Sequence, residues 1–210
     1  MKTVWLLFCV TSLWLHSFAY AQHPETIAPK EHEKEVRAYQ DHLNKEFKDP
    51  QQSPLSPKER KKFKGLPYFP IDYQYCVAAT FVRDSMSKPF LMQTTTDRKP
   101  EYRKYGELHF TLNNQSLKLT VFQNLGLSQK AGYEDYLFVP FTDLTNGIES
   151  YGGGRYLDFR MAQLQGEKIR LDFNLAYNPY CAYGQNYSCP IPPAENRLPD
   201  SIPAGVKSHH

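Results

Sequence analysis

The stretch Tyr105-Gly-Glu-Leu-His-Phe-Thr-Leu-Asn-Asn-Gln-Ser-Leu-Lys-Leu-Thr-Val121 contains the pattern that decides the fold. Apolar residues occupy alternate positions from Leu108 to Leu112 and again from Leu117 to Val121. Successive side chains of a strand point to opposite faces, so each run predicts a strand with one apolar face. Asn113-Asn114-Gln115 between the runs is typical of a turn. The stretch therefore predicts a half-buried β-hairpin.

Alternation of the same kind recurs along the chain after Ile71. The further strands are expected at Tyr73–Arg83, Phe90–Thr95, Asp135–Thr142, Arg155–Met161 and Lys168–Asn174. So many short strands predict a mainly β fold, an antiparallel β-barrel or sandwich. We expect the last two to form a hairpin across Gln165-Gly166-Glu167, because turn residues join them. Across that hairpin, a charged cluster is expected as surface pairs or as a pocket wall. Its members are Asp158, Arg170, Asp172 and Asn174.

One or two short helices are expected before the sheet. The apolar residues at steps of three, four and four are Val36, Tyr39, Leu43 and Phe47. This spacing predicts one apolar stripe on a helix, which ends at Asp49-Pro50 because proline cannot continue the hydrogen-bond ladder. Ser56-Pro57-Lys58-Glu59 predicts a second helix start, with Ser56 and Glu59 as a capping box.

The N-terminus has the form of a secretory signal peptide. Its apolar stretch runs from Val4 to Phe18 and leads to Ala19-Tyr20-Ala21, the small-x-small pattern of a cleavage site. The stretch is shorter than the roughly 20 residues of a membrane-spanning helix. We therefore predict a signal peptide over 1–21, no transmembrane anchor, and export to the bacterial periplasm or exterior.

After the signal peptide we expect one folded unit over 22–210. It consists of a leader and helical segment over 22–65, with 22–30 as a loose leader, and a β-rich domain over 66–210. Five prolines from Pro190 onward predict an extended tail laid over the body of the domain.

The charge balance argues against a nucleic-acid partner. The 210 residues include 25 basic and 22 acidic side chains, and loss of Lys2 with the signal peptide leaves an excess of only two. Nucleic-acid-binding domains usually carry a broad basic excess, whereas Lys58 to Lys64 is a local run typical of a solvated helix face.

Three cysteines follow the signal peptide, so one thiol stays unpaired in the monomer. Cys181 and Cys189 are separated by a flexible segment that permits a disulfide in an oxidising compartment. A metal site at these two cysteines is the alternative, with His109 or Glu195 as distant further ligands, but the spacing matches no zinc knuckle. No cofactor is predicted, and Cys76 is expected to be a small buried hydrophobe.

Two segments contain most of the candidate site residues. Tyr151-Gly-Gly-Gly-Arg155 leads into a strand rather than a helix, which favours a tight glycine-dependent turn over a phosphate-binding loop. The segment from Tyr177 to Asn196 is rich in tyrosine, and such loops either pack the end of a barrel or line a binding site. The ligand-binding candidates are Tyr151, Gly153, Arg155, Asp158, Asp172, Asn174, Asn178, Tyr180, Glu195 and Asn196.

From about Val36 to Val206 the chain resembles the domain of unknown function 1684 family of bacteria and archaea. The motifs that carry the resemblance are Phe63–Phe69, Phe141–Gly147, Tyr151–Phe159, Leu171–Tyr183 and Cys189–Asn196. The resemblance implies a shared fold and a shared site around these motifs, without an established activity, substrate or cofactor. It also implies many cytoplasmic relatives, which favours a metal or packing role for the two cysteines. Ala204-Gly205-Val206-Lys207 lacks the acidic residue expected after the glycine, which argues against a functional role for the extreme C-terminus.

Two functional hypotheses follow, and each requires the glycine turn and the tyrosine-rich loop to meet at one end of the sheet. The first is a module whose open end, at Tyr151–Arg155 and Asn174–Asn196, binds a small molecule or an envelope protein. The second is a hydrolase-like envelope enzyme, in which Arg155 holds an anionic group. Its acid or base is a carboxylate from among Asp158, Asp172 and Glu195. If the motifs serve packing alone, their polar groups are buried and satisfied by one another.

Overall fold

The predicted hairpin is present in the computed structural model, which describes residues 27–208. It consists of β3 (Glu101–Leu112) and β4 (Gln115–Asn124), and Leu112 pairs with Gln115. The two turn residues, Asn113 and Asn114, have φ values of 48° and 59°. Positive φ at both central positions belongs to a type I′ turn, whose twist matches that of the strands. The turn therefore sets the register of the hairpin.

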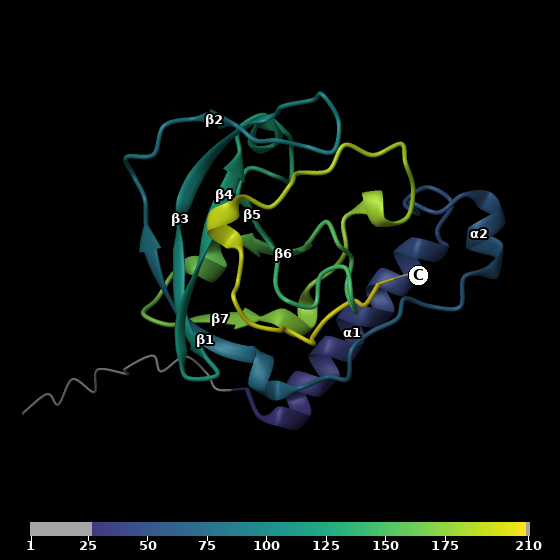
Figure 1. Cartoon of the computed structure of the whole chain (residues 1–210), viewed down its shortest axis with the longest axis horizontal. Helices are drawn as coiled ribbons and strands as arrows, with labels where there is room; N and C mark the ends of the chain where they lie inside the picture. Colours follow the sequence, from purple (N-terminus) through teal and green to yellow (C-terminus); the bar gives the residue numbers. More distant parts are fainter. Residues whose placement is uncertain (1–26, 209–210) are drawn as a thin grey trace, which may run out of the picture.

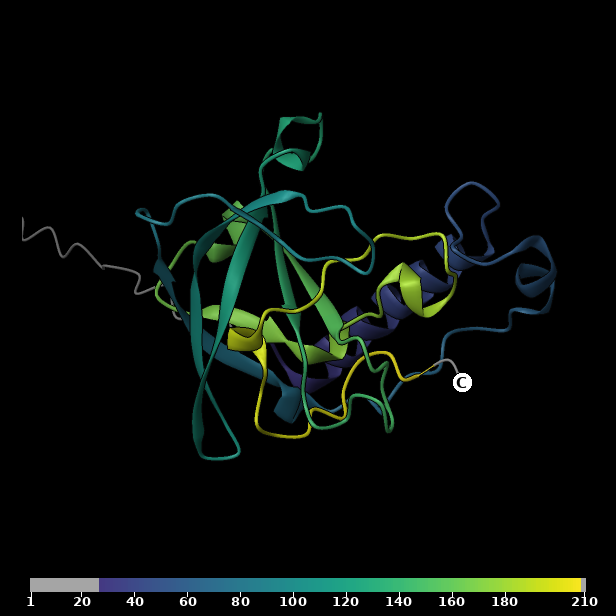
Figure 2. The same ribbon diagram turned by 45° about the horizontal axis from the view of Figure 1, so that its top comes forward.

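The two strands lie in the middle of an antiparallel sheet that curls into a half-barrel (Figures 1 and 2). The strand order is β6-β5-β4-β3-β1-β7, and β2 pairs with the start of β3. The remaining strands are β1 (Cys76–Arg83), β2 (Phe90–Leu91), β5 (Tyr136–Phe141), β6 (Arg155–Arg160) and β7 (Ile169–Asp172). The predicted mainly β, antiparallel fold is confirmed. Each of these five strands lies within its expected range but is shorter, whereas β3 and β4 extend beyond the runs that predicted them.

The second predicted hairpin is wrong. Strand β6 pairs with β5 over its whole length, whereas β7 pairs with β1 at the other end of the strand order. A 3-10 turn over Met161–Leu164 follows β6, so the connection is longer than a tight turn. Asp158 on β6 and Asp172 on β7 are therefore not on neighbouring strands, and the expected charged cluster does not form across a hairpin.

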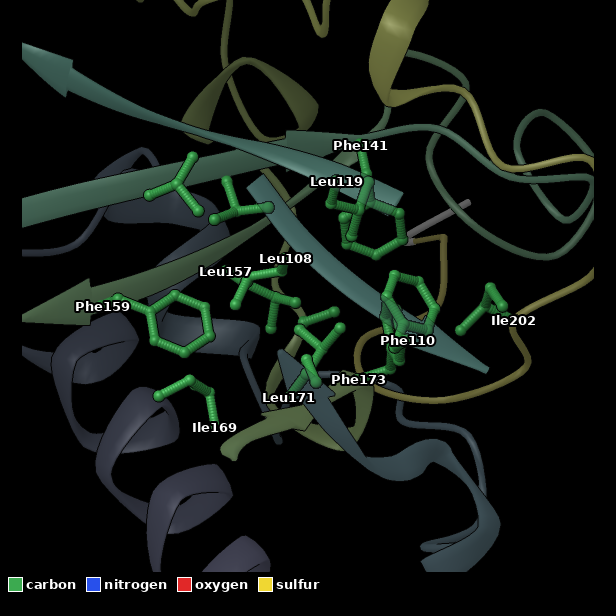
Figure 3. Packing of buried hydrophobic residues seen from close by; sticks show 14 of the residues in the cluster. Leu108, Phe110, Leu119, Phe141, Leu157, Phe159, Ile169, Leu171, Phe173 and Ile202 are labelled. Atoms are coloured by element: carbon green, nitrogen blue, oxygen red, sulfur yellow. The ribbon is translucent and has the colours of Figure 1, made fainter. Parts of the chain in front are cut away.

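The interior of the half-barrel contains the main hydrophobic cluster (Figure 3). Leu157 of β6 and Leu171 of β7 both contribute to it, although their strands are at opposite ends of the sheet. Complete burial of a leucine or phenylalanine side chain stabilises a fold by about 1.5–3 kcal/mol. The members labelled in Figure 3 are Leu108, Phe110, Leu119, Phe141, Leu157, Phe159, Ile169, Leu171, Phe173 and Ile202.

The C-terminal segment lies over the main cluster and contributes buried residues to it. Leu198, Ile202 and Ala204 are buried in the main cluster. The Asn196 side chain is fully buried and forms hydrogen bonds with the backbone of Thr120 and Pro140. These bonds attach the tail to the middle of the sheet.

Both predicted helices are present. Helix α1 (Pro29–Lys48) buries Val36 and Phe47, and it begins inside the expected loose leader because proline is tolerated in the first helical turn. Helix α2 (Pro57–Lys62) has the predicted capping box, with Ser56 and Glu59 bonding each other's backbone amides. No helix within residues 27–208 is long and apolar enough to cross a membrane. The expected signal peptide lies outside the described residues.

Candidate functional site

A cavity of about 690 Å³ lies between α1, strands β5 and β6, and the loop that follows β7. We call it the tyrosine pocket. Its size is within the range of about 300–1,000 Å³ that is usual for small-molecule sites. The tyrosines that line it are Tyr39, Tyr102, Tyr133, Tyr136, Tyr156, Tyr177, Tyr180, Tyr183 and Tyr187.

Asp158 is a carboxylate in the wall of the tyrosine pocket. The alternation of β6 directs Leu157 and Phe159 into the main core, so Asp158 points to the opposite face. Its Oδ1 accepts hydrogen bonds from the hydroxyls of Tyr136 and Tyr177, at 2.7 Å and 2.8 Å. No hydrogen bond to its Oδ2 is formed within residues 27–208.

The position of Tyr177 follows from backbone pairing. The loop after β7 runs antiparallel to the edge strand β6, and Tyr156 and Tyr177 exchange two backbone hydrogen bonds of 2.9 Å and 3.1 Å. Tyr136 lies on the neighbouring strand β5, on the same face as Asp158. Strand pairing therefore brings the two donors to one carboxylate.

The pKa values of the Asp158 carboxyl and of the Tyr136 and Tyr177 hydroxyls are all raised. The side chain is exposed to the pocket, but protein encloses the pocket, and this burial raises the pKa of the Asp158 carboxyl. The two tyrosine hydrogen bonds and the Arg160 charge act in the opposite direction. Burial, followed by the Asp158 charge, raises the pKa of Tyr136 and of Tyr177 well above the ordinary value. Both hydroxyls therefore stay protonated at neutral pH.

The remaining charged groups of the pocket are partly paired with one another. Arg160 donates to Asp135 Oδ1 at 2.7 Å and to the Gly132 carbonyl at 2.8 Å. On α1, His42 Nε2 lies 3.3 Å from Glu46 Oε1. Asp158 has no cationic partner among the ion pairs of the described residues.

Asn178 adds a second acceptor to the pocket wall. It is 2 % exposed, and its amide nitrogen donates to the Lys207 carbonyl at 2.8 Å. Its Oδ1 is buried and lacks a hydrogen-bond partner among the described residues. Buried polar atoms are nearly always paired, so this unpaired oxygen is a candidate acceptor for a ligand. The pocket wall thus contains two acceptor oxygens without a partner in the described residues, one on the exposed Asp158 and a buried one on Asn178.

A disulfide holds the rim of the pocket. Cys181 and Cys189 are bonded, with an S–S distance of 2.20 Å, and Cys189 lines the pocket. The Thr95 amide donates to the Cys189 carbonyl at 2.9 Å, which attaches the loop to the segment after β2. Oxidised sulfurs are not thiolate ligands, so the alternative metal site at these cysteines does not fit this structure. His109, a distant further ligand expected for that site, has its Nε2 within 3.0 Å of Glu107 Oε2.

Arg155 lies on the opposite face of β6 from Asp158 and is fully buried. Its Nη2 lies 2.7 Å from Asp143 Oδ2 and 2.8 Å from the Ile202 carbonyl, and its Nη1 donates to the Ala204 carbonyl. These contacts attach the C-terminal segment to the sheet. Arg155 does not line the tyrosine pocket.

Most other candidates from the sequence also have partners within the protein. Asp172 and Asn174 are buried and bonded to each other, and Glu195 pairs with Lys104 at 2.7 Å. Gly153 lies against the Tyr151 ring, where an added Cβ would come within 2.5 Å of a ring carbon. Of the ten ligand-binding candidates, those that line the pocket are Asp158, Asn178 and Tyr180.

The glycine turn contacts the tyrosine-rich loop through Tyr151, but none of the residues from Tyr151 to Arg155 lines the tyrosine pocket. Tyr151 packs in a cluster with Ala182 and Tyr183, beside Phe47 of α1.

Sequence reasoning missed the contributions of Tyr39 and Glu46 from α1 and of Tyr136 from β5 to the tyrosine pocket. Tyr39 belongs to the apolar stripe of a helix, and such a position carries no local signal of which loop it faces. The site is thus formed by α1, the outer face of the sheet and the tyrosine-rich loop.

Comparison with known proteins places the chain in a family. Residues 61–207 match the model described as "Protein of unknown function (DUF1684)". The chain belongs to this family. The DUF1684 chain is also similar to an uncharacterised protein of Haloarcula marismortui whose structure was determined by NMR in solution, with 36% sequence identity and a TM-score of 0.67. The match covers 86% of this chain and 97% of the archaeal one. No curated protein matches.

Proposed function

We propose that this DUF1684 protein is a binding module that holds a small organic cation in the tyrosine pocket. The observation that carries the proposal is the Asp158 carboxylate, bonded by two tyrosine hydroxyls and surrounded by aromatic rings. Aromatic faces attract cations through the ring quadrupole, by about 0.5–2 kcal/mol for each well-placed ring. A carboxylate inside such a cage adds a charge-assisted hydrogen bond to an N–H donor.

The ligand class favoured by these groups is a protonated amine. Asp158 Oδ2 and Asn178 Oδ1 are both acceptors without a partner in the described residues, which favours a ligand with several N–H donors. A quaternary ammonium ion has no such donor and is stabilised by the rings alone. We therefore expect primary amines to bind more tightly than quaternary ions of similar size.

The enzyme alternative receives less support from the positions of its residues. It combined Arg155 with a carboxylate from Asp158, Asp172 or Glu195, and of these four only Asp158 lines the pocket. An anion-binding arginine is thus separated from the candidate acid. We propose binding without turnover as the function of this site.

We also propose that the protein acts outside the cytoplasm. The small-x-small pattern at Ala19-Tyr20-Ala21 and the apolar stretch before it support this location. A disulfide at the pocket rim is compatible with an oxidising compartment. A cationic segment of an envelope protein is the alternative ligand with the same chemistry.

The test is isothermal titration calorimetry with n-butylamine, tetramethylammonium and the neutral analogue butan-1-ol. We expect binding of both cations, with the amine tighter, and none of the alcohol. Asp158→Asn keeps the shape but removes the charge and should weaken amine binding about 10- to 100-fold, since hydrogen bonds to charged groups contribute about 1.5–3 kcal/mol. Glu195→Gln, a carboxylate outside the pocket, is the matched control. Equal affinity of Asp158→Asn and the unmodified protein would refute the proposal.

A further inference from the structure

Three side chains of different elements meet away from the residues that line the tyrosine pocket. They are His32 of α1, Cys76 at the start of β1 and Asp172 at the end of β7. Their ligand atoms all lie within 4.8 Å of one another, and His32 Nε2 is 2.8 Å from Asp172 Oδ2. Cys76 and Asp172 are direct partners in the β1–β7 pairing. The sheet register and the first turns of α1 therefore bring them together.

The carboxylate of this cluster is held in one orientation. Asp172 Oδ1 accepts from the backbone amide of Asn174 at 3.0 Å and from its side-chain amide at 2.8 Å. Asn174 is itself fixed by two hydrogen bonds with the backbone of Asp72. Oδ2 is consequently directed at His32. Outer groups that orient a ligand in this way are usual around metal sites.

We propose that His32, Cys76 and Asp172 bind a divalent metal ion, with zinc as the ion that the three ligand types fit. Thiolate, imidazole and carboxylate are the three protein ligand types of zinc, with metal–ligand distances of about 2.0–2.3 Å. Tetrahedral ligands of one zinc ion lie about 3–4 Å apart, so a small rotation of the Cys76 side chain completes the set. Three protein ligands leave a fourth position, and Cys76 is only half-buried, so this position faces solvent.

A structural role for the same contacts is the competing explanation. In that case the His32–Asp172 hydrogen bond only anchors the start of α1 to the sheet. The edge contact between the His32 and Tyr73 rings adds to the same anchor. Cys76 is not needed for an anchor, because the His32–Asp172 bond does not involve it and it lies outside the main hydrophobic cluster, yet its thiol is a hydrogen-bond partner of Asp172. The two explanations differ in whether a metal ion binds.

The experiment is a titration of the metal-free protein with Co²⁺, followed by absorption in the near ultraviolet. Among residues 22–210 the disulfide occupies Cys181 and Cys189, so in protein without the expected signal peptide and its Cys9 a thiolate-to-cobalt band reports on Cys76 alone. We expect one equivalent of Co²⁺ to produce this band and Zn²⁺ to displace it. Cys76→Ala should abolish the band, and Asn174→Ala should weaken Co²⁺ binding about 10- to 100-fold. His42→Gln changes an exposed histidine on the same helix and should leave the absorption band and the Co²⁺ affinity unchanged.

Absence of the band in the unmodified protein would overturn the proposal. So would a band that persists at full strength in both His32→Gln and Asp172→Asn. Cys76→Ala replaces a half-exposed residue at a strand end, so its fold is expected to survive, and circular dichroism checks this. If His32→Gln unfolds, Asp172→Asn still tests the carboxylate ligand, because it keeps the size of the side chain and the Oδ1 acceptor.

Discussion

The guanidinium of Arg155 lies in the core and donates to the Asp143 carboxylate across 2.7 Å, and both side chains are fully buried. The same guanidinium is bonded to the carbonyls of Ile202 and Ala204 in the C-terminal segment. Removal of one partner from a buried ion pair leaves an uncompensated charge, which costs about 3–5 kcal/mol. We expect Arg155→Met to lower the free energy of unfolding by that amount, as measured by urea denaturation.

The control for this change is Arg160→Met on the same strand. Arg160 pairs with Asp135 at the surface, where both side chains are nearly half exposed. Exposed pairs contribute at most about 1 kcal/mol, so this variant should unfold close to the midpoint of the unmodified protein. Similar losses for both variants would show that the buried pair has no special role.

The affinity of the tyrosine pocket for an amine should fall in acid. Binding requires ionised Asp158, whose pKa is raised by burial, so protonation begins at a higher pH than for an ordinary aspartate. Below that pKa the affinity is expected to drop about tenfold for each pH unit. Calorimetry from about pH 8 to about pH 4 measures the drop. A pH dependence that remains in Asp158→Asn would show that a group other than Asp158 controls binding.

Asp158 should also destabilise the fold at neutral pH. A carboxyl whose pKa is raised in the folded state holds its proton more tightly there than in the unfolded chain, so stability decreases as pH rises through the raised pKa. Asp158→Asn is therefore expected to raise the melting temperature at neutral pH but not at a pH low enough to protonate the carboxyl in both states. Asp135→Asn, an exposed carboxylate, should not show this gain.

Reduction of the disulfide should weaken both the fold and the pocket. The Cys181–Cys189 bond closes a loop with a sequence separation of 8, which corresponds to about 2.5 kcal/mol on the chain-entropy model. Because Cys189 lines the tyrosine pocket, we expect Cys181→Ser/Cys189→Ser to bind amines more weakly as well. Denaturation and calorimetry on the same sample measure the two effects. Unchanged amine affinity in a destabilised variant would mean that the rim does not shape the pocket.

Export predicts a defined N-terminus. Cleavage after Ala21 leaves Gln22 as the first residue, which intact-mass measurement of the protein from its native host detects. A mass that includes residues 1–21 in all of the recovered protein would contradict export by cleavage.

The sequence alone determined those features that depend on neighbours along the chain. The alternation around Leu108 and the Asn113-Asn114 turn predicted a hairpin that is present, and Ser56 and Glu59 predicted a capping box that is present. The period-two pattern of Arg155–Arg160 is also sufficient to put Arg155 and Asp158 on opposite faces of the strand, as in the structure. Local backbone geometry is sufficient for such assignments, because hydrogen bonds and side-chain directions repeat over a few residues.

Only the tertiary structure decided which strands pair and which face of β6 is core. The apolar pattern of β7 fits β6 as well as β1, and pairing is chosen by contacts between residues far apart in sequence. Both faces of β6 are covered, one by the C-terminal segment and the other by the tyrosine-rich loop, so alternation alone does not separate the buried Arg155 from the accessible Asp158. Tyr39 reaches the same pocket from α1, and no local pattern encodes that approach, because it arises from the packing of the helix against the completed sheet.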